Sequence, residues 1–327
     1  MIMNSLCALA LGFVLDMIFS DPPTVIYPLE LIKRLVRSLE DTLRKAYADS
    51  PDAQNMAGIM LVVMTLIICL GVSFALLFIG YKINVVLGIV IEGILCWSSM
   101  SVKYIRRNML GVFRSARANN ESAARRYLKK LTCRDVDELD IAQCEKCAVE
   151  AASENAVDWV IGPVFWICLL GGIGGIFCRC VNIMDNTVGY KTEDCKYLGQ
   201  VPARLDDVVM FIPARIAALL MRLNSSFLKL DSGNAATVYK RDRKKSPSPN
   251  SGCTQSVCAG ALNIQLGSDE YYGGELVRKP AIGDDAKAVD ENDVFWTNQL
   301  VMGTAAYGII LAALVRVLVY VLVLKVF

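Results

Sequence analysis

The sequence predicts an all-α, polytopic membrane protein with about four to five transmembrane or re-entrant helices and polar cytoplasmic helical loops. Three observations predict this class. Hydrophobic residues make up 54% of the 327 residues, above the roughly 45–50% of an ordinary soluble domain. They are concentrated in runs, and a run of about 20 apolar residues is long enough to cross a bilayer as a helix. Basic residues cluster in the polar segments between the runs, as the positive-inside rule expects for cytoplasmic loops.

The apolar runs are expected to be spans of a single membrane-embedded domain, 1–327. The predicted spans lie near 2–19, 56–80, 83–100, 157–181 and 300–324. The second and third runs are separated by a turn too short to hold another element, so they are predicted to form a helical hairpin. No small-residue cleavage site follows the first run, which argues against a cleaved signal peptide.

The other segments carry more polar residues. The segment 205–223 is apolar but has Pro213 in its middle and arginines on its length, which predicts a kinked interfacial or re-entrant helix. Four glycines in the run 157–181 have small side chains that allow a neighbouring helix to approach closely. The polar segment 101–156 has an excess of basic residues, and 231–299 carries a basic run at Lys240, Arg241, Arg243, Lys244 and Lys245. Both segments are therefore expected to face the cytoplasm.

Composition also excludes several classes of chemistry. The chain contains no histidine, so histidine–zinc sites and serine–histidine triads are impossible. The net charge of +2 gives no global indication of nucleic-acid binding. The twelve cysteines are spread through a long chain, partly inside apolar runs, and do not form the dense framework of a small secreted domain.

A first acidic cluster precedes the run 157–181. Glu150 and Glu154 are one helical turn apart and share a face, with Asn155 beside them. Two like charges so placed are stable when they are solvated, paired with arginine, or bridged by a cation such as magnesium, which prefers oxygen ligands. A solvated helix face is the simpler interpretation of the spacing alone.

Two more polar clusters adjoin the apolar runs. One contains Asn182, Asp185 and Tyr190, directly after the glycine-rich run. The other contains Arg204, Asp206, Asp207 and Arg215. Charged groups at or inside a bilayer are costly and are often functional, although Arg204 and Asp207 are three residues apart and could simply pair with each other.

A fourth cluster lies in the polar segment 231–299. A loop with two prolines holds Ser248 and Asn250, and it is followed by a second turn with Tyr272 and Glu275. Prolines fix the backbone, while hydroxyl, amide and glycine groups leave donors that can face an anion. An ordinary polar turn is the alternative.

Cys144 and Cys147 form a lone C-x-x-C with no second pair. Two thiolates cannot complete a tetrahedral zinc site. We therefore expect neither a metal nor a functional disulfide at this pair.

The clusters occur in six ordered motifs across roughly residues 8–290. These are LDMIFSDPP, EAASENAVDWVIGPVF, VNIMDNTVGY, ARLDDVVMFIPAR, SPSPNSG and AGALNIQLGSDEYYGGE. In order and approximate spacing they resemble the adenosylcobinamide-phosphate synthase family of cobalamin biosynthesis, known as CbiB or CobD.

The resemblance implies a multi-pass enzyme of the cell membrane with its active site facing the cytoplasm. It implies an amide ligase that uses ATP and Mg²⁺ to join adenosylcobyric acid to an aminopropanol phosphate or ethanolamine phosphate. Carboxylates can hold the metal and arginines can clamp phosphate in such a site. Catalytic roles are expected for Glu150, Glu154, Asp185, Asp206 and Asp207, of which Glu150, Glu154 and Asp207 are the expected magnesium ligands. Substrate binding is expected from Asn155, Asn182, Tyr190, Arg204, Arg215, Ser248, Asn250, Tyr272 and Glu275.

The chain departs from the family pattern at its histidines. Tyr27 stands where family members often have histidine, and Ser246 stands where a histidine commonly precedes the Pro-Ser-Pro-Asn loop. An asparagine usually occupies the position of Met210. An essential histidine base is therefore impossible here.

Two other function classes stay open at this point. A related membrane protein of the AmpE type would act as a sensor or regulator without ligase activity, and would have no reason to keep the acidic clusters together. A transporter would use Asp16, Glu92 and Arg316 as an intramembrane path, but the chain shows no internal repeat. The sequence does not fix the aminoalcohol phosphate or the number of chains in a homo-oligomer.

Overall fold

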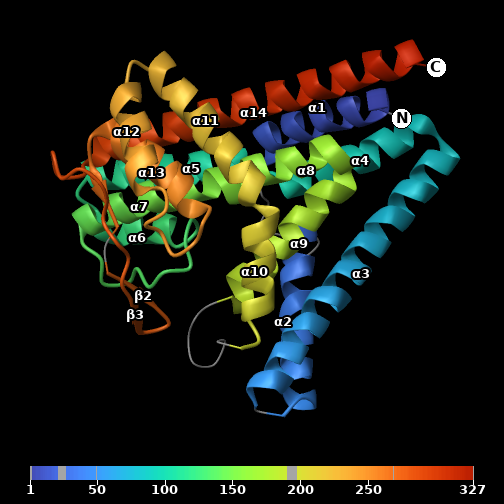
Figure 1. The fold of residues 1–327 in the computed structure, drawn as a ribbon, viewed down its shortest axis with the longest axis horizontal. Coiled ribbons are helices and arrows are strands. Elements are labelled where there is room, and N and C mark those ends of the chain that lie inside the picture. The colour runs from blue at the N-terminus through green and yellow to red at the C-terminus, as the bar shows by residue number, and fades with distance from the viewer. Residues whose placement is uncertain (1, 21–26, 49, 190–196, 268, 327) are drawn as a thin grey trace. The chain divides into compact units, whose positions relative to one another are not determined.

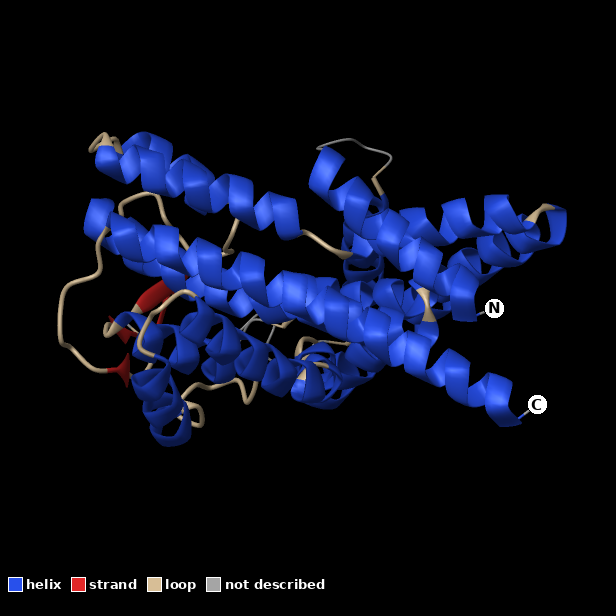
Figure 2. Cartoon of the chain, turned by 90° about the horizontal axis from the view of Figure 1, so that it is seen from above, coloured by secondary structure: helices blue, strands red, loops and turns tan. Residues whose placement is uncertain are grey.

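The structure is a computed structural model that describes residues 2–20, 27–48, 50–189, 197–267 and 269–326. It confirms the all-α class (Figure 2), because strands within these ranges are only two or three residues long. The first nine helical elements are α1 (Ile2–Phe19), α2 (Pro28–Ala46), α3 (Pro51–Ile83), α4 (Val85–Ser99), α5 (Val102–Arg117), α6 (Glu121–Leu128), α7 (Ile141–Ala156), the π-helix η1 (Val157–Ile161) and α8 (Gly162–Leu170). The elements that follow are α9 (Gly172–Val188), α10 (Gln200–Val209), α11 (Phe211–Phe227), α12 (Ser232–Asp242), α13 (Ser251–Leu262), β1 (Gln265–Leu266), β2 (Glu270–Tyr272), β3 (Glu275–Val277), β4 (Ile282–Gly283) and α14 (Glu291–Val326).

The chain divides into two compact units, where the sequence analysis expected one domain. Unit 1 comprises residues 1–101, 162–209 and 309–327, and unit 2 comprises residues 102–161 and 210–308. The units change between α4 and α5, between η1 and α8, between α10 and α11, and inside α14, which contributes residues to both. The apolar runs and the polar segments of the sequence therefore correspond broadly to different units.

Unit 1 contains the predicted helical hairpin, made by α3 and α4 (Figure 1). The turn is a single residue, Asn84, whose side chain accepts a hydrogen bond from the Val86 N–H and caps α4. Gly80 and Gly88 lie so close that a Cβ on Gly80 would be 3.3 Å from the Gly88 Cα. Small residues therefore let the two helices meet directly after the turn.

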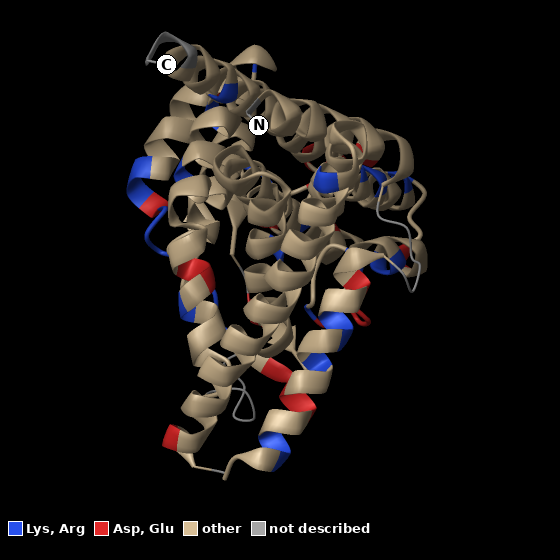
Figure 3. Ribbon diagram, turned by 90° about the vertical axis from the view of Figure 1, so that its right-hand side faces the viewer, with Lys and Arg blue, Asp and Glu red and all other residues tan. Residues whose placement is uncertain are grey.

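Length and apolar composition identify three membrane-span candidates in the described residues. They are Pro51–Ile83, Val85–Arg117 and Glu291–Val323. Figure 3 shows long stretches of these helices without charged residues. The last candidate begins earlier than the predicted span 300–324, because α14 continues back through a polar first turn.

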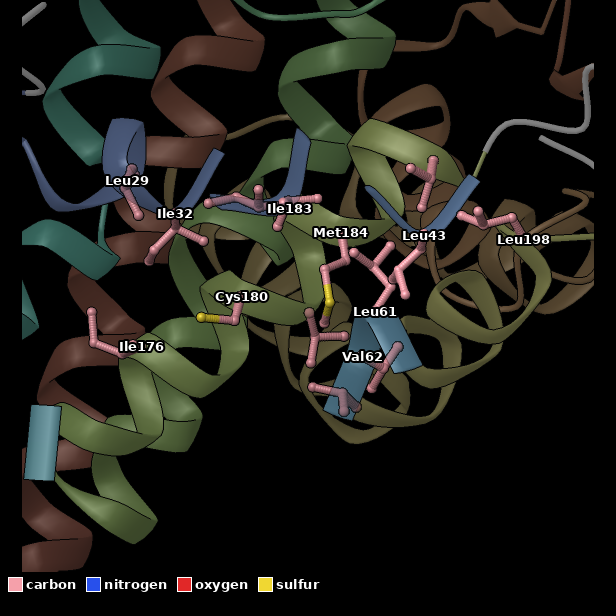
Figure 4. Close-up of a cluster of buried hydrophobic side chains, with 14 of the residues drawn as sticks. Leu29, Ile32, Leu43, Leu61, Val62, Ile176, Cys180, Ile183, Met184 and Leu198 are labelled. Atoms are coloured by element: carbon pink, nitrogen blue, oxygen red, sulfur yellow. The ribbon is translucent and has the colours of Figure 1, made fainter. Parts of the chain in front are cut away.

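The apolar face of α2 packs into unit 1. Leu43 lies beside Leu61 of α3 and Met184 of α9, and Leu29 and Ile32 extend the same buried cluster farther along α2 (Figure 4). These apolar positions recur at helical spacing, while Lys33, Arg37 and other charges occupy the remaining faces. The amphipathic stretch after the first run is therefore a helix with a buried face.

The run 157–181, expected as one span, is instead divided into η1, α8 and α9. The chain turns at Gly171, whose φ of +68° is in the region that favours glycine. After the turn α9 packs against α8, and a Cβ on Gly174 would be only 2.1 Å from the Trp166 carbonyl oxygen. The prediction that these glycines permit close helix approach is confirmed, but they also break the helix, which periodicity alone did not indicate.

The segment 205–223 is broken as its proline predicted. Helices α10 and α11 meet the criterion for a membrane span only as a bent pair. Pro213 has no N–H to donate to the carbonyl oxygen four residues earlier, on Val209. In unit 1 the Trp166 indole N–H donates to that oxygen at 3.2 Å. A tryptophan thus satisfies the acceptor that the proline leaves free.

Unit 2 consists of helices, with short strands between residues 265 and 283. Its helix α7 packs against α5, α6 and α13, and α13 also packs against α11 and α12. Antiparallel pairs β1–β4 and β2–β3 follow α13. Helix α13 is buried along its whole length, so it forms the centre of the unit.

Candidate functional site

The candidate site is built on α7 of unit 2. The helix begins at Asp140, whose side chain accepts from the Gln143 N–H at 2.8 Å while the Gln143 side chain accepts from the Asp140 N–H at 3.0 Å. This capping box fixes where the helix starts. Glu150 then falls on the buried face and is only 1% exposed.

Arg134 forms ion pairs with two carboxylates in the interior of unit 2. Its Nη1 lies 2.6 Å from Oε2 of Glu150 and 2.5 Å from Oε1 of Glu270. All three residues are buried, and Arg134 is 7% exposed. Buried charges persist only when they are paired and hydrogen-bonded, so this ion-pair network must form as a unit.

The second oxygen of Glu150 is also occupied. Its Oε1 accepts from the Gly267 N–H at 2.6 Å. Gly267 has a φ of +83°, and a Cβ there would be 2.2 Å from the Pro280 carbonyl oxygen, so this turn requires glycine. Burial disfavours the carboxylate, but Arg134 and these hydrogen bonds prevail and lower the pKa of Glu150 to about 2.

Glu270 connects the network to a lysine and a tyrosine. Its Oε2 lies 2.7 Å from Nζ of Lys279 and accepts from the Tyr272 hydroxyl at 2.9 Å. Lys279 in turn donates to the Tyr272 oxygen at 3.2 Å. Burial raises the pKa of Glu270 to about 7, with a further contribution from Glu150, against the attraction of Arg134 and Lys279. This carboxyl therefore changes its protonation state near neutral pH.

A narrow crevice opens beside this network. It is lined by Glu150, Ser246, Pro247, Gln255, Gly267, Lys279, Pro280 and Ile282. The lining residues come from α7, the loop before α13, α13 itself and the strand region. Lys279 supplies a cation, and Ser246 and Gln255 supply neutral hydrogen-bond donors. One cation and two neutral donors therefore face a crevice of about 10 Å³, together with the Glu150 carboxylate.

Three predicted substrate-binding residues lie together at the neighbouring loop. Arg215 donates to Oδ1 of Asn250 at 3.3 Å and to the Pro249 carbonyl oxygen at 3.4 Å. Its guanidinium group also lies over the Phe211 ring, 3.4 Å from the centroid. The Asn250 N–H donates to the Ser248 hydroxyl at 3.2 Å. Arg215 thus holds the loop that enters the crevice at Ser246.

The remaining predicted residues of unit 2 have varied surroundings. Asn155 is buried and donates to the Leu131 carbonyl oxygen at 2.8 Å, which is a structural contact. Glu154 is half-buried, and its charge acts on Lys279 and Tyr272. Glu275 is exposed on β3.

The other predicted residues belong to unit 1. Asn182 is buried and accepts from Arg179 at 3.3 Å. Asp206 is buried, Asp185 and Asp207 are half-buried, and Arg204 is exposed. Helices α9 and α10, which carry these residues, pack together. Tyr190 lies outside the described residues. That all these groups share one cavity with Glu150 stays a prediction.

Sequence reasoning missed Arg134, Lys279 and Glu270. Arg134 lies in a stretch that alternates acidic and apolar residues after a basic helix, where one more arginine resembles a solvated charge. Glu270 directly precedes the Tyr271–Tyr272 pair in a quoted motif. A buried acid next to two tyrosines was the available signal.

The fit to a metal differs between the expected ligands. No group of three Asp, Glu or Cys side chains that could hold a metal occurs within the described ranges. Glu150 fits poorly, because one oxygen is paired with Arg134 and the other with Gly267. Glu154 fits better as one ligand to a magnesium ion that is mainly bound by phosphates, since such ions take only one or two carboxylates from the protein.

One of the two C-x-x-C cysteines, Cys147, contacts the ion-pair network. The Cys147 sulfur accepts from Nη1 of Arg134 at 3.3 Å, and the Cys144 thiol donates to the Leu139 carbonyl oxygen at 3.8 Å. Burial raises the pKa of both thiols, to about 12 for Cys144. Both therefore stay protonated at neutral pH.

Comparisons with known proteins agree over most of the chain. A family model described as CobD/Cbib protein matches residues 9–301. The cobalamin biosynthesis protein CobD of Clostridium perfringens is 34% identical over 96% of this chain and 98% of its own length. The cobalamin biosynthesis protein CbiB of Salmonella typhi is 32% identical over 94% of this chain and 97% of its own length. CobD of Pelobacter propionicus is 34% identical over 86% of each chain. No solved structure matches the chain.

Proposed function

The chain belongs to the CobD/CbiB family of cobalamin biosynthesis, and on that premise we propose that it is an adenosylcobinamide-phosphate synthase. The reaction is an ATP-dependent ligation. It joins a carboxyl group of adenosylcobyric acid to the amine of an aminopropanol phosphate or ethanolamine phosphate. The observation that carries this proposal is the buried Arg134–Glu150–Glu270–Lys279 network beside a crevice with hydrogen-bond donors.

Such a ligation makes three demands on a site. A carboxylate is a poor electrophile until ATP activates it, so the site must hold that carboxylate and a polyphosphate. The amine must lose a proton before its nitrogen attacks the activated carbonyl carbon. Negative charge that develops on the carbonyl oxygen must be stabilised by fixed donors or cations.

The crevice residues suit the first and third demands. Lys279 is the cation on its wall, and Ser246 and Gln255 offer neutral donors. When Glu270 takes up a proton, the charge of its partner Lys279 becomes available to negative charge in the crevice. We assign to Lys279 the binding of the carboxylate or phosphate group.

Glu270 suits the second demand. General acid–base catalysis works best when the pKa of the group is close to the operating pH, and burial places the pKa of Glu270 at about 7. Glu270 contacts Lys279 directly at 2.7 Å. We assign to Glu270 the acceptance of the proton released by the attacking amine.

ATP and Mg²⁺ stay part of the proposal. ATP supplies the phosphoryl or adenylyl group that activates the carboxylate, and the magnesium ion would accompany its phosphates. Glu154 is the described residue best suited to contact that ion. Asp185, Asp206 and Asp207 keep their predicted catalytic roles as proposals, and the site is expected at the cytoplasmic face of the cell membrane.

The test is an assay for amide formation by purified membranes with adenosylcobyric acid, ATP, Mg²⁺ and each candidate amine. We expect Lys279→Met to lower turnover by about 100-fold or more, the usual effect of losing a charge-stabilising group. The matched control is Lys287→Met, because Lys287 also pairs with a buried carboxylate, Asp293, at 2.6 Å but does not line the crevice. The control should keep turnover near wild type.

Two results would contradict the proposal. If folded wild-type protein forms no amide with any amine, a non-enzymatic role of the AmpE type becomes the better interpretation. If amide forms but Lys279→Met is as active as Lys287→Met, the ligase function stands and the crevice is not its site.

A further inference from the structure

A row of basic residues follows one face of α5. Arg106, Arg107, Arg114 and Arg117 are exposed. They follow one another at intervals of one, seven and three residues, which places all four within an arc of about 100° on one side of a helix with 3.6 residues per turn. The opposite side is apolar and packs inside unit 2. Its residues Ile105, Met109 and Val112 are each fully buried. The packing of α5 therefore leaves the four arginines on the outer side of the helix.

Helix α6 extends this basic face. Arg126 and Lys130 are exposed at the end of α6, which packs against α5. We call the six exposed cations Arg106, Arg107, Arg114, Arg117, Arg126 and Lys130 the basic face. The one acid between residues 102 and 130 is Glu121, and it pairs with Arg125 at 2.8 Å. None of the six makes an ion pair with a described carboxylate.

Aromatic rings hold several of these cations in place. Arg107 lies over the Tyr104 ring at 5.5 Å, and Arg117 lies over the Phe113 ring at 5.7 Å. Arg126 and Lys130 lie over the Tyr127 ring at 5.8 and 5.5 Å. Cations on aromatic faces remain charged and exposed while they lose some freedom of movement. Arginine interleaved with aromatic residues is typical of the boundary between membrane and water.

The chain places this face next to an apolar span. Helix α4 ends at Ser99 and α5 begins at Val102. The apolar part of the span candidate Val85–Arg117 is its first part, because the cations begin at Lys103. Arg106 is seven residues beyond Ser99, which is at most about 25 Å even for an extended chain. The first cations of the face therefore occur where the chain leaves the hydrocarbon.

We propose that the basic face binds the headgroups of anionic phospholipids. The unpaired positive charge matches their phosphates, and each cation near an anionic membrane surface contributes to attraction. Arginine can hold a phosphate through two hydrogen bonds at once. A soluble polyanion such as RNA is the competing partner, but its binding would not explain why the face directly follows a membrane span. This inference does not depend on the proposed ligase function.

The experiment compares two lipids with the same acyl chains, phosphatidylglycerol and phosphatidylcholine. The full chain, purified in a neutral detergent, is titrated with each lipid, and bound lipids are counted by native mass spectrometry. We expect wild-type protein to bind phosphatidylglycerol about tenfold more tightly. The variant Arg106→Gln/Arg114→Gln/Arg117→Gln should reduce this preference to within about twofold.

The control is Lys229→Gln/Lys240→Gln/Lys244→Gln, which removes three exposed cations from α12 and the turns on either side of it in unit 2. It should keep the wild-type preference, and circular dichroism checks that both variants are folded. Equal binding of the two lipids by wild type, or equal preference in the arginine variant and the control, would overturn the proposal. Tighter binding of tRNA than of phosphatidylglycerol, lost in the arginine variant, would instead assign the face to a soluble polyanion.

Discussion

The two units stabilise buried charges in different ways. In unit 1, Glu92 is 6% exposed and accepts hydrogen bonds from the Ser5 hydroxyl, the Tyr81 hydroxyl and, at 3.3 Å, the Gly172 N–H. In the same unit Arg316 donates to the Ile167 carbonyl oxygen at 2.5 Å. The partners are neutral groups. In unit 2, Arg134 is surrounded by carboxylates instead.

The difference separates a structural role from a chemical one. Glu92 accepts from the first N–H of α9 and thereby fixes the start of that helix after the turn at Gly171. The hydrogen bonds to Glu92 described above all come from neutral donors within unit 1. The network of unit 2 contains two cations and two acids, one of which titrates near neutral pH, and it borders a crevice. Its net charge can therefore respond to an anion that binds there.

The largest expected effect comes from breaking the charged network. Arg134→Met removes the cation between Glu150 and Glu270 and leaves two buried carboxylates without their main partner. Loss of one partner of a buried ion pair typically costs about 3–5 kcal/mol. We expect a large fall in the thermal midpoint in detergent, or no folded protein at all.

A second variant distinguishes lost charge pairing from lost packing. Adding Glu150→Gln to Arg134→Met removes one uncompensated charge, and Glu270 can then take up a proton. The double variant should be more stable than Arg134→Met alone. If both variants melt like wild type, the ion pairs of Arg134 contribute little to stability. Unit 2 would then not depend on ion pairs to stabilise its buried charges.

The next effect concerns turnover rather than stability. We predict that Asp206→Asn or Asp207→Asn lowers amide formation by about 100-fold or more, as expected for a base or metal ligand that loses its charge but keeps its shape. Arg316→Leu should mainly weaken folding. Arg316 donates to the Ile167 carbonyl oxygen of α8, so its loss should act on packing within unit 1.

Turnover per folded molecule, with folding checked by thermal melting, decides between these roles. Near wild-type turnover in both asparagine variants, together with loss of turnover in Arg316→Leu, would move the active site into the membrane interior. The carboxylates of α10 would then be structural, like Glu92.

The sequence allowed the fold class and part of the site to be predicted. Apolar run length indicated α3, α4 and the later part of α14, because a span needs an uninterrupted apolar helix. Ordered motifs indicated the family. Spacing alone favoured a solvated helix face for Glu150, and the family resemblance gave it a functional role. The structure shows that the solvated face is wrong, because Glu150 is buried in the network beside the crevice.

The rest depends on contacts that spacing does not reveal. Arg134 and Glu270 are far apart in the chain, and only Glu270 has a partner nearby in the sequence, the Tyr272 hydroxyl. The break at Gly171 depends on a positive φ within a run that is apolar throughout, so hydropathy alone predicts one helix. Pro213 predicted a break in its own helix, but spacing did not reveal the contact that compensates for it. The Val209 carbonyl oxygen that the proline leaves free accepts from Trp166, a residue of another helix.

A smaller expected effect is the pH dependence of stability that Glu270 gives to unit 2. The pKa of Glu270 is raised from an ordinary 4.5 to about 7 in the folded protein. The folded state therefore retains a proton between these values that the unfolded chain releases. Stability from this group is complete below pH 4.5 and is lost as pH rises to about 7, by on the order of 2 kcal/mol.

The Glu270→Gln variant isolates this contribution, because glutamine stays neutral at every pH. Burial also raises the pKa of Glu145, to about 7, but that residue is the same in both proteins and cancels in the difference. We expect the melting temperature of Glu270→Gln relative to wild type to rise by several degrees between pH 5 and pH 8. A constant difference over this range would show that Glu270 is ionised throughout and is no proton acceptor.

The smallest expected effect is that of replacing both cysteines of the C-x-x-C pair. Cys147 accepts a hydrogen bond from Arg134, and a serine hydroxyl can accept the same bond, so Cys144→Ser/Cys147→Ser preserves the network. Because burial keeps both thiols protonated, neither is a ready metal ligand or nucleophile. We expect turnover to change by less than about twofold and stability to fall by about 1 kcal/mol, since a buried polar group replaces a thiol. Metal analysis of the purified wild-type protein provides the independent check. Stoichiometric zinc that disappears in the double variant would contradict this prediction. Cys147 would then bind a metal in addition to its contact with Arg134.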